Sequence, residues 1–243
     1  MRKSSFLMCI PLAGIVFAGT PLLLGSSFHV APVRIELSDR KPTTVLQVGN
    51  EGDEPVTVQV RVLGWQQHGN DDVYPETNEI FISPPIAKIA PHSKQLIRIA
   101  LRHKEVLIAE RAYRVFIEEV PGPVKPDFTG VNTLLQVSVP IYRKPANPSA
   151  AARLSWAADF TPDGFLRLTV SNAGEIHFLI HSVSVTSPGK DPVTQKSVQC
   201  VLAGSKREWI FRDESLKRVT HITLEAVTDS GELHEEITPH SSE

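Results

Sequence analysis

Cysteine is scarce in this chain of 243 residues, which contains only Cys9 and Cys200. Cys9 lies in an apolar N-terminal segment that we expect to be cleaved off, so one cysteine remains in the mature protein. A single cysteine cannot form an intrachain disulfide, although small exported domains often depend on disulfides for stability. We therefore expect the fold to rely on packing, with Cys200 as a buried small apolar residue rather than a nucleophile.

A long apolar run occurs near the N-terminus, within residues 1–27. A basic Arg-Lys pair precedes FLMCIPLAGIVFAGTPLLLG, and small residues follow at 25–27, which is the pattern of a secretory signal. A membrane anchor is the alternative, because the run is about as long as the ~20 residues of a spanning helix. Pro11, Pro21 and the small residues favour cleavage. We expect residues 1–27 to be a signal peptide, with no membrane insertion after its removal.

Neither sign of charge is in excess. The chain has 25 basic and 27 acidic residues, and removing the two basic residues of the signal from 25 leaves 23 against 27. A protein that binds nucleic acid through its backbone phosphates usually carries a basic excess. We therefore expect no nucleic-acid partner.

Motifs of catalytic and metal sites are missing from the sequence. We find no HExxH, HxH or CxxC pattern, no GxSxG, no phosphate-binding loop and no dinucleotide glycine fingerprint. His177 and His181 are four residues apart in an alternating segment, and on a strand that spacing separates them by about 13 Å. The sequence therefore predicts no enzyme, no metal site and no cofactor.

Helical periodicity is nearly absent, and short alternating apolar runs with turn signals between them take its place. Seven such runs in the first half are typical of an antiparallel sandwich. They read HVAPVRIEL, TTVLQVGN, VTVQVRVLGW, EIFISPP, QLIRIAL, YRVFIEEV and LLQVSVPIY.

The alternating pattern resumes after RKPANPSAAA, a Pro- and Ala-rich stretch that we interpret as a hinge. The later runs are RLSWAADF, FLRLTVSN, IHFLIHSVSVT, KREWIFRD, VTHITLEAVT and ELHEEIT. We predict an all-β protein with two β-sandwich domains, residues 28–145 and 146–243, joined at an angle by a short hinge.

The stretch NTLLQVSVPIYRKP, residues 132–145, combines an apolar strand with a proline. Pro140 cannot donate a ladder hydrogen bond, and such residues are confined to edge strands, strand ends or bulges. An apolar edge invites pairing with another chain. We expect this edge to be functional rather than a defect.

Basic side chains gather near the hinge end of this strand and of YRVFIEEV. If Glu110 faces Arg143 across an antiparallel hairpin, Arg114 faces Val139. Residues that face each other share one side of a sheet, so arginines there would project toward the space between the domains. A basic corner beside an apolar edge suits the carboxylate at the end of an extended peptide, because the arginine fork matches a carboxylate. Solvated strand edges are the alternative interpretation of each single arginine.

The chain resembles the periplasmic pilus-assembly chaperones, which have two immunoglobulin-like domains. The resemblance covers most of residues 28–145 through VRIEL, IFISPPIAKIAPHSKQLIRI, YRVFIEEVP and LLQVSVPIYRKP, and extends weakly to EAVTDSGEL. The SVPIY wording and the spacing are most similar to the archaic branch. The resemblance implies a non-enzymatic periplasmic chaperone that caps pilin subunits by donor-strand complementation and delivers them to an outer-membrane usher. It also allows a self-capping homodimer.

The resemblance also implies roles for particular residues. The lent donor strand would use alternating side chains, namely Val131, Thr133, Leu135, Val137 and Val139. The carboxylate anchor of the family uses an arginine of the first strand, matched here by Arg34, and a lysine, whose position holds Val139. We hypothesise that Arg114 supplies the missing charge.

A charge network between the domains is a further implication of the resemblance. Glu110 and Arg143 match its first two positions, and Asp229 is the plausible third. Such a network would set the angle between the domains. Two other classes remain as alternatives at this point, a two-domain adhesin or structural subunit of a surface appendage, and a secreted hydrolase on a β scaffold.

Overall fold

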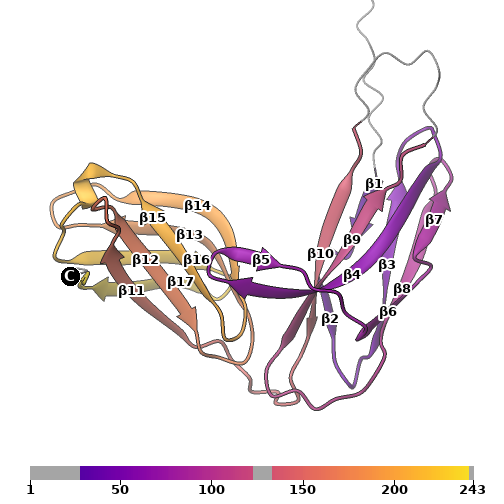
Figure 1. Cartoon of the computed structure of the whole chain (residues 1–243), viewed down its shortest axis with the longest axis horizontal. Coiled ribbons are helices and arrows are strands. Elements are labelled where there is room, and N and C mark those ends of the chain that lie inside the picture. The colour runs from indigo at the N-terminus through magenta and orange to yellow at the C-terminus, as the bar shows by residue number, and fades with distance from the viewer. Residues whose placement is uncertain (1–27, 123–132, 241–243) are drawn as a thin grey trace, which may run out of the picture.

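The computed structural model describes residues 28–122 and 133–240, which form two β-sandwiches set at an angle to each other (Figure 1). The expected signal segment and Val131 lie outside these residues. Within the described ranges, none of the helical segments has the length and apolar character needed to cross a bilayer. The one described helical turn, η1, is a 3-10 turn at Glu214–Leu216. The prediction of an all-β protein is confirmed.

The first sandwich packs a four-stranded sheet against a six-stranded sheet. In spatial order the first sheet contains β1 (Phe28–Ala31), β3 (Thr43–Asn50), β8 (Lys94–Leu101) and β6 (Ile80–Ser83). The second contains β2 (Ile35–Leu37), β10 (Gln136–Arg143), β9 (Arg111–Glu119), β4 (Val56–His68) and β5 (Asp71–Val73), with β7 (Ile86–Ile89) paired to the other end of β4.

The second sandwich has sheets of three and four strands. The smaller sheet contains β11 (Leu154–Phe160), β12 (Leu166–Asn172) and β15 (Lys206–Phe211). The larger contains β14 (Val193–Val201), β13 (Phe178–Thr186), β16 (Ile222–Thr228) and β17 (Gly231–Ile237).

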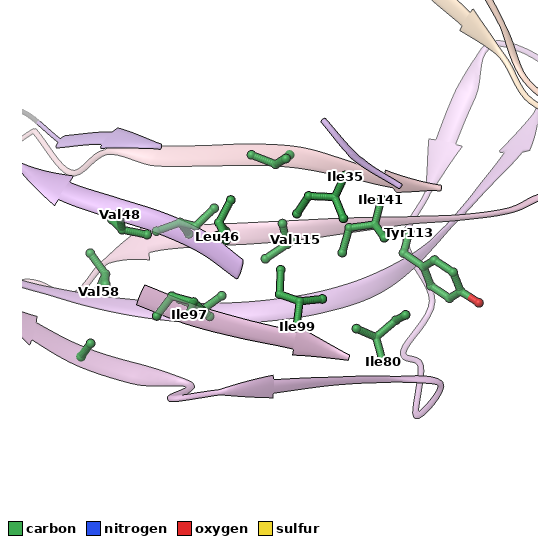
Figure 2. Packing of buried hydrophobic residues seen from close by; sticks show 14 of the residues in the cluster. Ile35, Leu46, Val48, Val58, Ile80, Ile97, Ile99, Tyr113, Val115 and Ile141 are labelled. Atoms are coloured by element: carbon green, nitrogen blue, oxygen red, sulfur yellow. The ribbon is translucent and has the colours of Figure 1, made fainter. Parts of the chain in front are cut away.

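Alternation along each strand builds the core of the first sandwich. On β9, Tyr113, Val115 and Ile117 are buried, while the residues between them face away from the core. They meet branched residues of the opposite sheet, such as Ile97 and Ile99 (Figure 2). Each fully buried side chain of this size contributes about 1.5–3 kcal/mol relative to exposure. The core side of β9 is therefore committed to packing, and its other side is available for a site.

The opening segment crosses from one sheet to the other. β1 pairs with β3, whereas β2 pairs in parallel with β10, and only over Ile141–Arg143. In the described part of the chain, no strand pairs with Gln136–Pro140 on that side of β10. Most of β10 therefore has an open edge.

The two sandwiches are joined in two ways. Residues 144–153 connect β10 to β11, and a boundary at residue 145 falls within this segment. In addition, the β4–β5 hairpin extends from the first sandwich to the second (Figure 1).

The strand prediction differs from the structure in its opening run and in three strands that it missed. HVAPVRIEL is two strands, because Pro32 has no amide hydrogen for the ladder and the chain changes sheet there. The strands without a counterpart among the predicted runs are β5, β7 and β14. β5 and β7 are short, and the sequence of β14, VTQKSVQCV, is largely polar with weak alternation.

Candidate functional site

The cleft between the domains is floored by the outward side of β10, β9 and β4. Register places Tyr142 opposite Ala112 and Ala112 opposite Trp65. The neighbouring row on the same side contains Pro140 and Arg114. Residues that face each other across strands share one side of a sheet, so two aromatic rings and one arginine lie together beside the hinge.

The second domain covers the aromatic row. Trp65 and Tyr142 pack with Cys200 and Leu202 in a buried cluster that joins the domains. Tyr142 also stacks on His177, with ring centroids 3.6 Å apart and planes 3° apart. Burial raises the pKa of the Cys200 thiol to about 11. The expectation that Cys200 is a buried residue rather than a nucleophile agrees with this environment.

Arg114 has an unusual environment for a cation. Its Cζ lies 4.0 Å from the centroid of the Trp65 ring, and its Nη1 donates to Ser138 Oγ at 3.3 Å. Its Nε is buried without a hydrogen-bond acceptor. Among the described residues, no carboxylate lies within ion-pair distance of Arg114. This guanidinium therefore retains capacity for an anionic ligand.

Arg34 lies on the other side of the same cleft, between β1 and β2. Its Nη2 donates to Glu36 Oε1 at 2.8 Å, and its Nη1 lies 3.8 Å from Asp229 of the second domain. Its Cζ is 5.8 Å from the centroid of the Tyr142 ring. The hydrogen bond to Glu36 outweighs partial burial and raises the pKa of Arg34 above its usual range. Arg34 is thus cationic and partly neutralised by its neighbours.

A cavity of about 300 Å³ brings these groups together. Arg34, Arg114 and Arg207 supply its cations, and Asp72, which is paired with Arg207, supplies an anion. Exposed Val33 of the first domain and Val198 of the second add apolar surface. A carboxylate with an apolar neighbour fits this lining, because arginine forks bind carboxylates in charge-assisted pairs. In the part of the chain that the structure describes, no group of His, Cys and acidic residues could hold a metal ion.

The predicted register of the hairpin is wrong by one residue. Arg143 faces Arg111, so Arg114 faces Pro140 and Val115 faces Val139. The prediction assumed an ion pair between Glu110 and Arg143, and the two side chains have other partners. Arg114 nevertheless projects into the cleft, because its own position in β9 faces away from the core.

The residues predicted as a donor strand differ in exposure along the chain. Thr133 is exposed, Leu135 and Val137 are half-buried, and Val139 is only 2% exposed within the core of the first sandwich. Val131 lies outside the described residues. The side chain of Val139 is therefore already covered by the core, whereas the predicted donor-strand side chains farther from the hinge are more exposed.

The structure does not bring Glu110, Arg143 and Asp229 into one network. Among the described residues, Glu110 pairs with His177 of the second domain, with Oε1 2.6 Å from Nδ1. Asp229 pairs with His181 at 2.7 Å and lies 3.8 Å from Arg34. Glu110 and Asp229 thus take part in two separate contacts between the domains.

Arg143 lies within the first domain instead. It is 2% exposed, because residue 143 has the same alternation as the core residues Val139 and Ile141. Its guanidinium contacts Asp39 at 3.2 Å, Glu79 at 3.5 Å and Glu105 at 3.9 Å. Its role is to hold loops of one domain together.

The contacts of the β4–β5 hairpin with the second domain were not predicted from the sequence. Gln67 in the β4–β5 hairpin donates to Cys200 O at 2.9 Å and accepts from Leu202 N at 3.0 Å. Asn70 exchanges two hydrogen bonds with the backbone of Glu208. Arg207, which is 3% exposed, donates to the backbone of Asn70 and to the carboxylate of Asp72. These contacts hold the hairpin against the second domain.

Residues 27–148 match the sequence profile of the family described as pili and flagellar-assembly chaperone, PapD N-terminal domain. No curated protein sequence matches significantly.

Solved structures of similar fold include several chaperones. The crystal structure of the CsuC–CsuE chaperone–tip adhesion subunit pre-assembly complex, from the archaic chaperone–usher Csu pili of Acinetobacter baumannii, gives a TM-score of 0.67 at 23% identity, covering 88% of this chain and 99% of that chain. The Salmonella enterica SafA pilin–SafB chaperone complex gives 0.60 at 18%, covering 86% and 95%. The Pseudomonas aeruginosa CupB2 chaperone gives 0.55 at 18%, covering 86% and 98%.

These likenesses show the fold of two immunoglobulin-like sandwiches over nearly the whole length of the described chain. The profile match covers about half of the full chain and includes the cleft side of β10, β9 and β4. The chain therefore belongs to the family of pili and flagellar-assembly chaperones.

Proposed function

We propose that this chaperone captures a pilin subunit in the periplasm by lending it the open edge of β10. The subunit would add a strand to this edge, so that main-chain hydrogen bonds supply affinity and alternate side chains supply fit. Thr133, Leu135 and Val137 would form the lent surface, together with Val131. The side chain of Val139 would support the strand from within the chaperone's own core.

The open edge beside a cationic cavity is the observation that carries the proposal. β2 covers only three residues of β10, and the cavity with Arg34 and Arg114 lies at the covered end. A subunit strand running along the edge would therefore bring its terminal carboxylate to the arginines. Arg114 is the principal anchor in this proposal, because its charge is not neutralised by a carboxylate of the chaperone.

The proposed partner is a pilin subunit, and the proposed location is the periplasm. The printed descriptions of two similar structures name chaperone–subunit complexes, CsuC–CsuE and SafA–SafB, which supports a pilin subunit as the partner. Delivery to an outer-membrane usher, export through the signal at 1–27 and self-capping as a homodimer belong to the same proposal. The chaperone acts without enzymatic activity, and release of the subunit follows from exchange of strands.

Co-expression with candidate pilins tests the capture of a subunit. We expect a soluble one-to-one complex with at least one pilin encoded near the chaperone, measured by co-purification and light scattering. The complex should keep a subunit soluble that aggregates when it is expressed alone. If every such pilin aggregates equally with and without this chain, the proposal is wrong.

Arg114→Ala tests the anchor. We expect the captured pilin to fall about tenfold or more, because a charge-assisted hydrogen bond contributes about 1.5–3 kcal/mol. Arg61→Ala is the matched control, since Arg61 lies on the same side of the sheet but is paired with Glu118 at 2.7 Å. Equal capture by the Arg114→Ala variant and the wild type would exclude Arg114 as the anchor.

A further inference from the structure

The surroundings of Arg114 are built from the neighbouring strand. Trp65 in β4 faces Ala112, and Arg114 faces Leu63, so Trp65 and Arg114 are diagonal neighbours on one side of the sheet. Diagonal pairs lie within reach of aromatic and long side chains. The guanidinium carbon lies 4.0 Å from the Trp65 ring centroid, within the range in which a cation is attracted by the ring.

A second ring extends this surface toward Arg34. The Tyr142 ring centroid lies 6.1 Å from that of Trp65, with the planes tilted by 41°. The Arg34 Cζ lies 5.8 Å from the centroid of the Tyr142 ring, so each cleft arginine lies over one ring of the pair. The register accounts for the pair, because Trp65 and Tyr142 both face Ala112, whose small side chain leaves the rings room.

Trp65 has the features of a rigid support. It is 4% exposed, and it packs in the cluster between the domains with Tyr142, Cys200 and Leu202. Arg114, by contrast, is held by no ion pair with a described carboxylate, and its one described hydrogen bond is to Ser138. Without the ring beneath it, a long side chain with so few contacts would lose its fixed orientation. Ligand binding would then have to order the side chain, and the loss of conformational entropy would weaken binding.

A buried donor of Arg114 adds a separate indication. Its Nε is buried without an acceptor among the described residues, and Arg114 lines the cavity. Native proteins rarely leave buried donors unpaired. The Nε of Arg114 therefore points to an acceptor that is supplied from outside the chain.

From this geometry we infer that Trp65 is a positioning residue of the carboxylate anchor, holding the Arg114 guanidinium flat and ready for a terminal carboxylate. The inference rests on the proposed function and adds a specificity to it. The cavity should distinguish a free carboxylate from an uncharged terminal amide, and this distinction should depend on the Trp65 ring.

A peptide pair separates the inference from the function on which it rests. The probe is a decapeptide with the last ten residues of the pilin that co-purifies with the wild-type chain, prepared as the free acid and as the C-terminal amide. Binding to the full mature chain is measured by calorimetry or by competition against the captured pilin. The wild type should bind the acid about tenfold or more tightly than the amide. Equal binding of the two would overturn the carboxylate anchor itself.

Substitutions at Trp65 then test the inference. Trp65→Leu should weaken binding of the acid about tenfold and leave binding of the amide unchanged, so that the acid-to-amide ratio falls toward one. Trp65→Phe retains a ring and should keep most of the ratio. Leu202→Ala is the control for loosening of the same cluster. Leu202 is a second-domain member of the cluster, and it does not line the cavity.

The ratio is the decisive readout, because a general loss of packing would weaken both peptides alike. If Trp65→Leu lowers acid and amide binding equally, or if Leu202→Ala lowers the ratio as much, Trp65 is merely structural and the inference is wrong. If Trp65→Leu keeps the wild-type ratio while the wild type still prefers the acid, the anchor stands and the inference fails.

Discussion

Arg143 and Arg114 belong to one hairpin, yet their positions in the alternation give them opposite roles. Arg143 faces the core side and is surrounded by Asp39, Glu79 and Glu105. Arg114 faces the cleft, where no described carboxylate reaches it. A buried cation with three carboxylates is saturated, whereas one resting on a ring can still accept an anionic ligand. Side-chain parity thus separates an arginine that is already paired from one that is available to a ligand.

Replacement of Arg143 should be costly. Arg143→Met keeps the volume but leaves the three carboxylates without their buried partner, and we expect the free energy of unfolding to fall by about 2–3 kcal/mol. Arg61→Ala removes an exposed pair and should change it by at most about 1 kcal/mol. Urea unfolding measures both. Equal losses in the two variants would contradict the structural role of Arg143.

The loss in free energy of unfolding caused by Arg143→Met should also depend on pH. Burial raises the pKa of Glu79, but hydrogen bonds from Tyr113 and Arg111 and the charges of Arg111 and Arg143 outweigh it, so the pKa lies below its ordinary value of 4.5. A carboxylate whose pKa is lowered by folding stabilises the folded state at pH values above its unfolded-state pKa. This stabilisation is lost as the pH falls through its folded-state pKa. The difference in the free energy of unfolding between the wild type and Arg143→Met should therefore become smaller below pH 4.5.

At the scale of the element, β10 is divided into two parts. Its hinge half is buried by β2 and the core, and its far half ends in half-buried or exposed residues beside an open edge. Continuous backbone pairing with β9 holds both parts straight. A strand that is rigid along one edge and free along the other is suited to being shared with a partner.

Matched serine substitutions separate these two parts. Leu135→Ser should lower pilin capture severalfold while changing the free energy of unfolding by less than about 1 kcal/mol, because Leu135 is only half-buried. Val139→Ser should instead destabilise the chain by about 2–3 kcal/mol, since it places a hydroxyl in the core. Co-purification and urea unfolding are measured on both variants. Loss of stability without loss of capture in Leu135→Ser would contradict this division.

Elements were predicted more reliably than contacts between them. Alternation indicated most strands, because the pattern that buries one side of a strand is a local property of the sequence. It missed β14, which is mostly polar, and the short strands β5 and β7. It also missed a likeness between the halves, since VGNEG and VSNAG each place a buried asparagine, Asn50 and Asn172, whose side chain bonds the backbone near a strand end.

The site was predicted only in part, for a physical reason. Arg34 and Arg114 both line the cavity, as predicted from their neighbouring strands: Arg34 directly precedes β2, and Arg114 lies on the side of β9 that faces away from the core. The roles of Trp65 and Arg207 depend on contacts between distant segments, such as Asp72 and Arg207, which are 135 residues apart. No spacing within the sequence encodes such contacts. The predicted Glu110–Arg143 pair failed because the register shifts by one residue.

For the whole molecule, the angle between the domains is held from two sides. The hinge joins them covalently, and the β4–β5 hairpin joins them through Gln67, Asn70 and Asp72 (Figure 1). Between these lies the cluster with Trp65 and Tyr142. Because the cavity takes residues from both domains, a fixed angle is a condition for its shape. Gln67 and Asn70 of the hairpin do not line the cavity, so their contacts are expected to act on binding through this angle.

Cys200 offers a direct measure of this coupling, because its thiol is buried in the cluster between the domains. Burial raises its pKa to about 11, so little thiolate exists at pH 8 and alkylation of the folded chain should be slow. The chain is produced without residues 1–27, so that Cys200 is its single cysteine and alone reacts. Asn70→Ala removes the two hydrogen bonds of the hairpin with the backbone of Glu208, and we expect alkylation to accelerate severalfold through opening of the domains.

The control for that experiment is Arg167→Ala, which removes an arginine paired with Asp159 within the second domain, at 2.7 Å and away from the hairpin. Its alkylation rate should equal that of the wild type. If Asn70→Ala is alkylated no faster than Arg167→Ala, these two hydrogen bonds do not hold the domains together, and the fixed angle must come from the hinge, the aromatic cluster and the other hairpin contacts. If it is alkylated faster and also captures less pilin, the angle and the cavity are coupled, since Asn70 does not line the cavity.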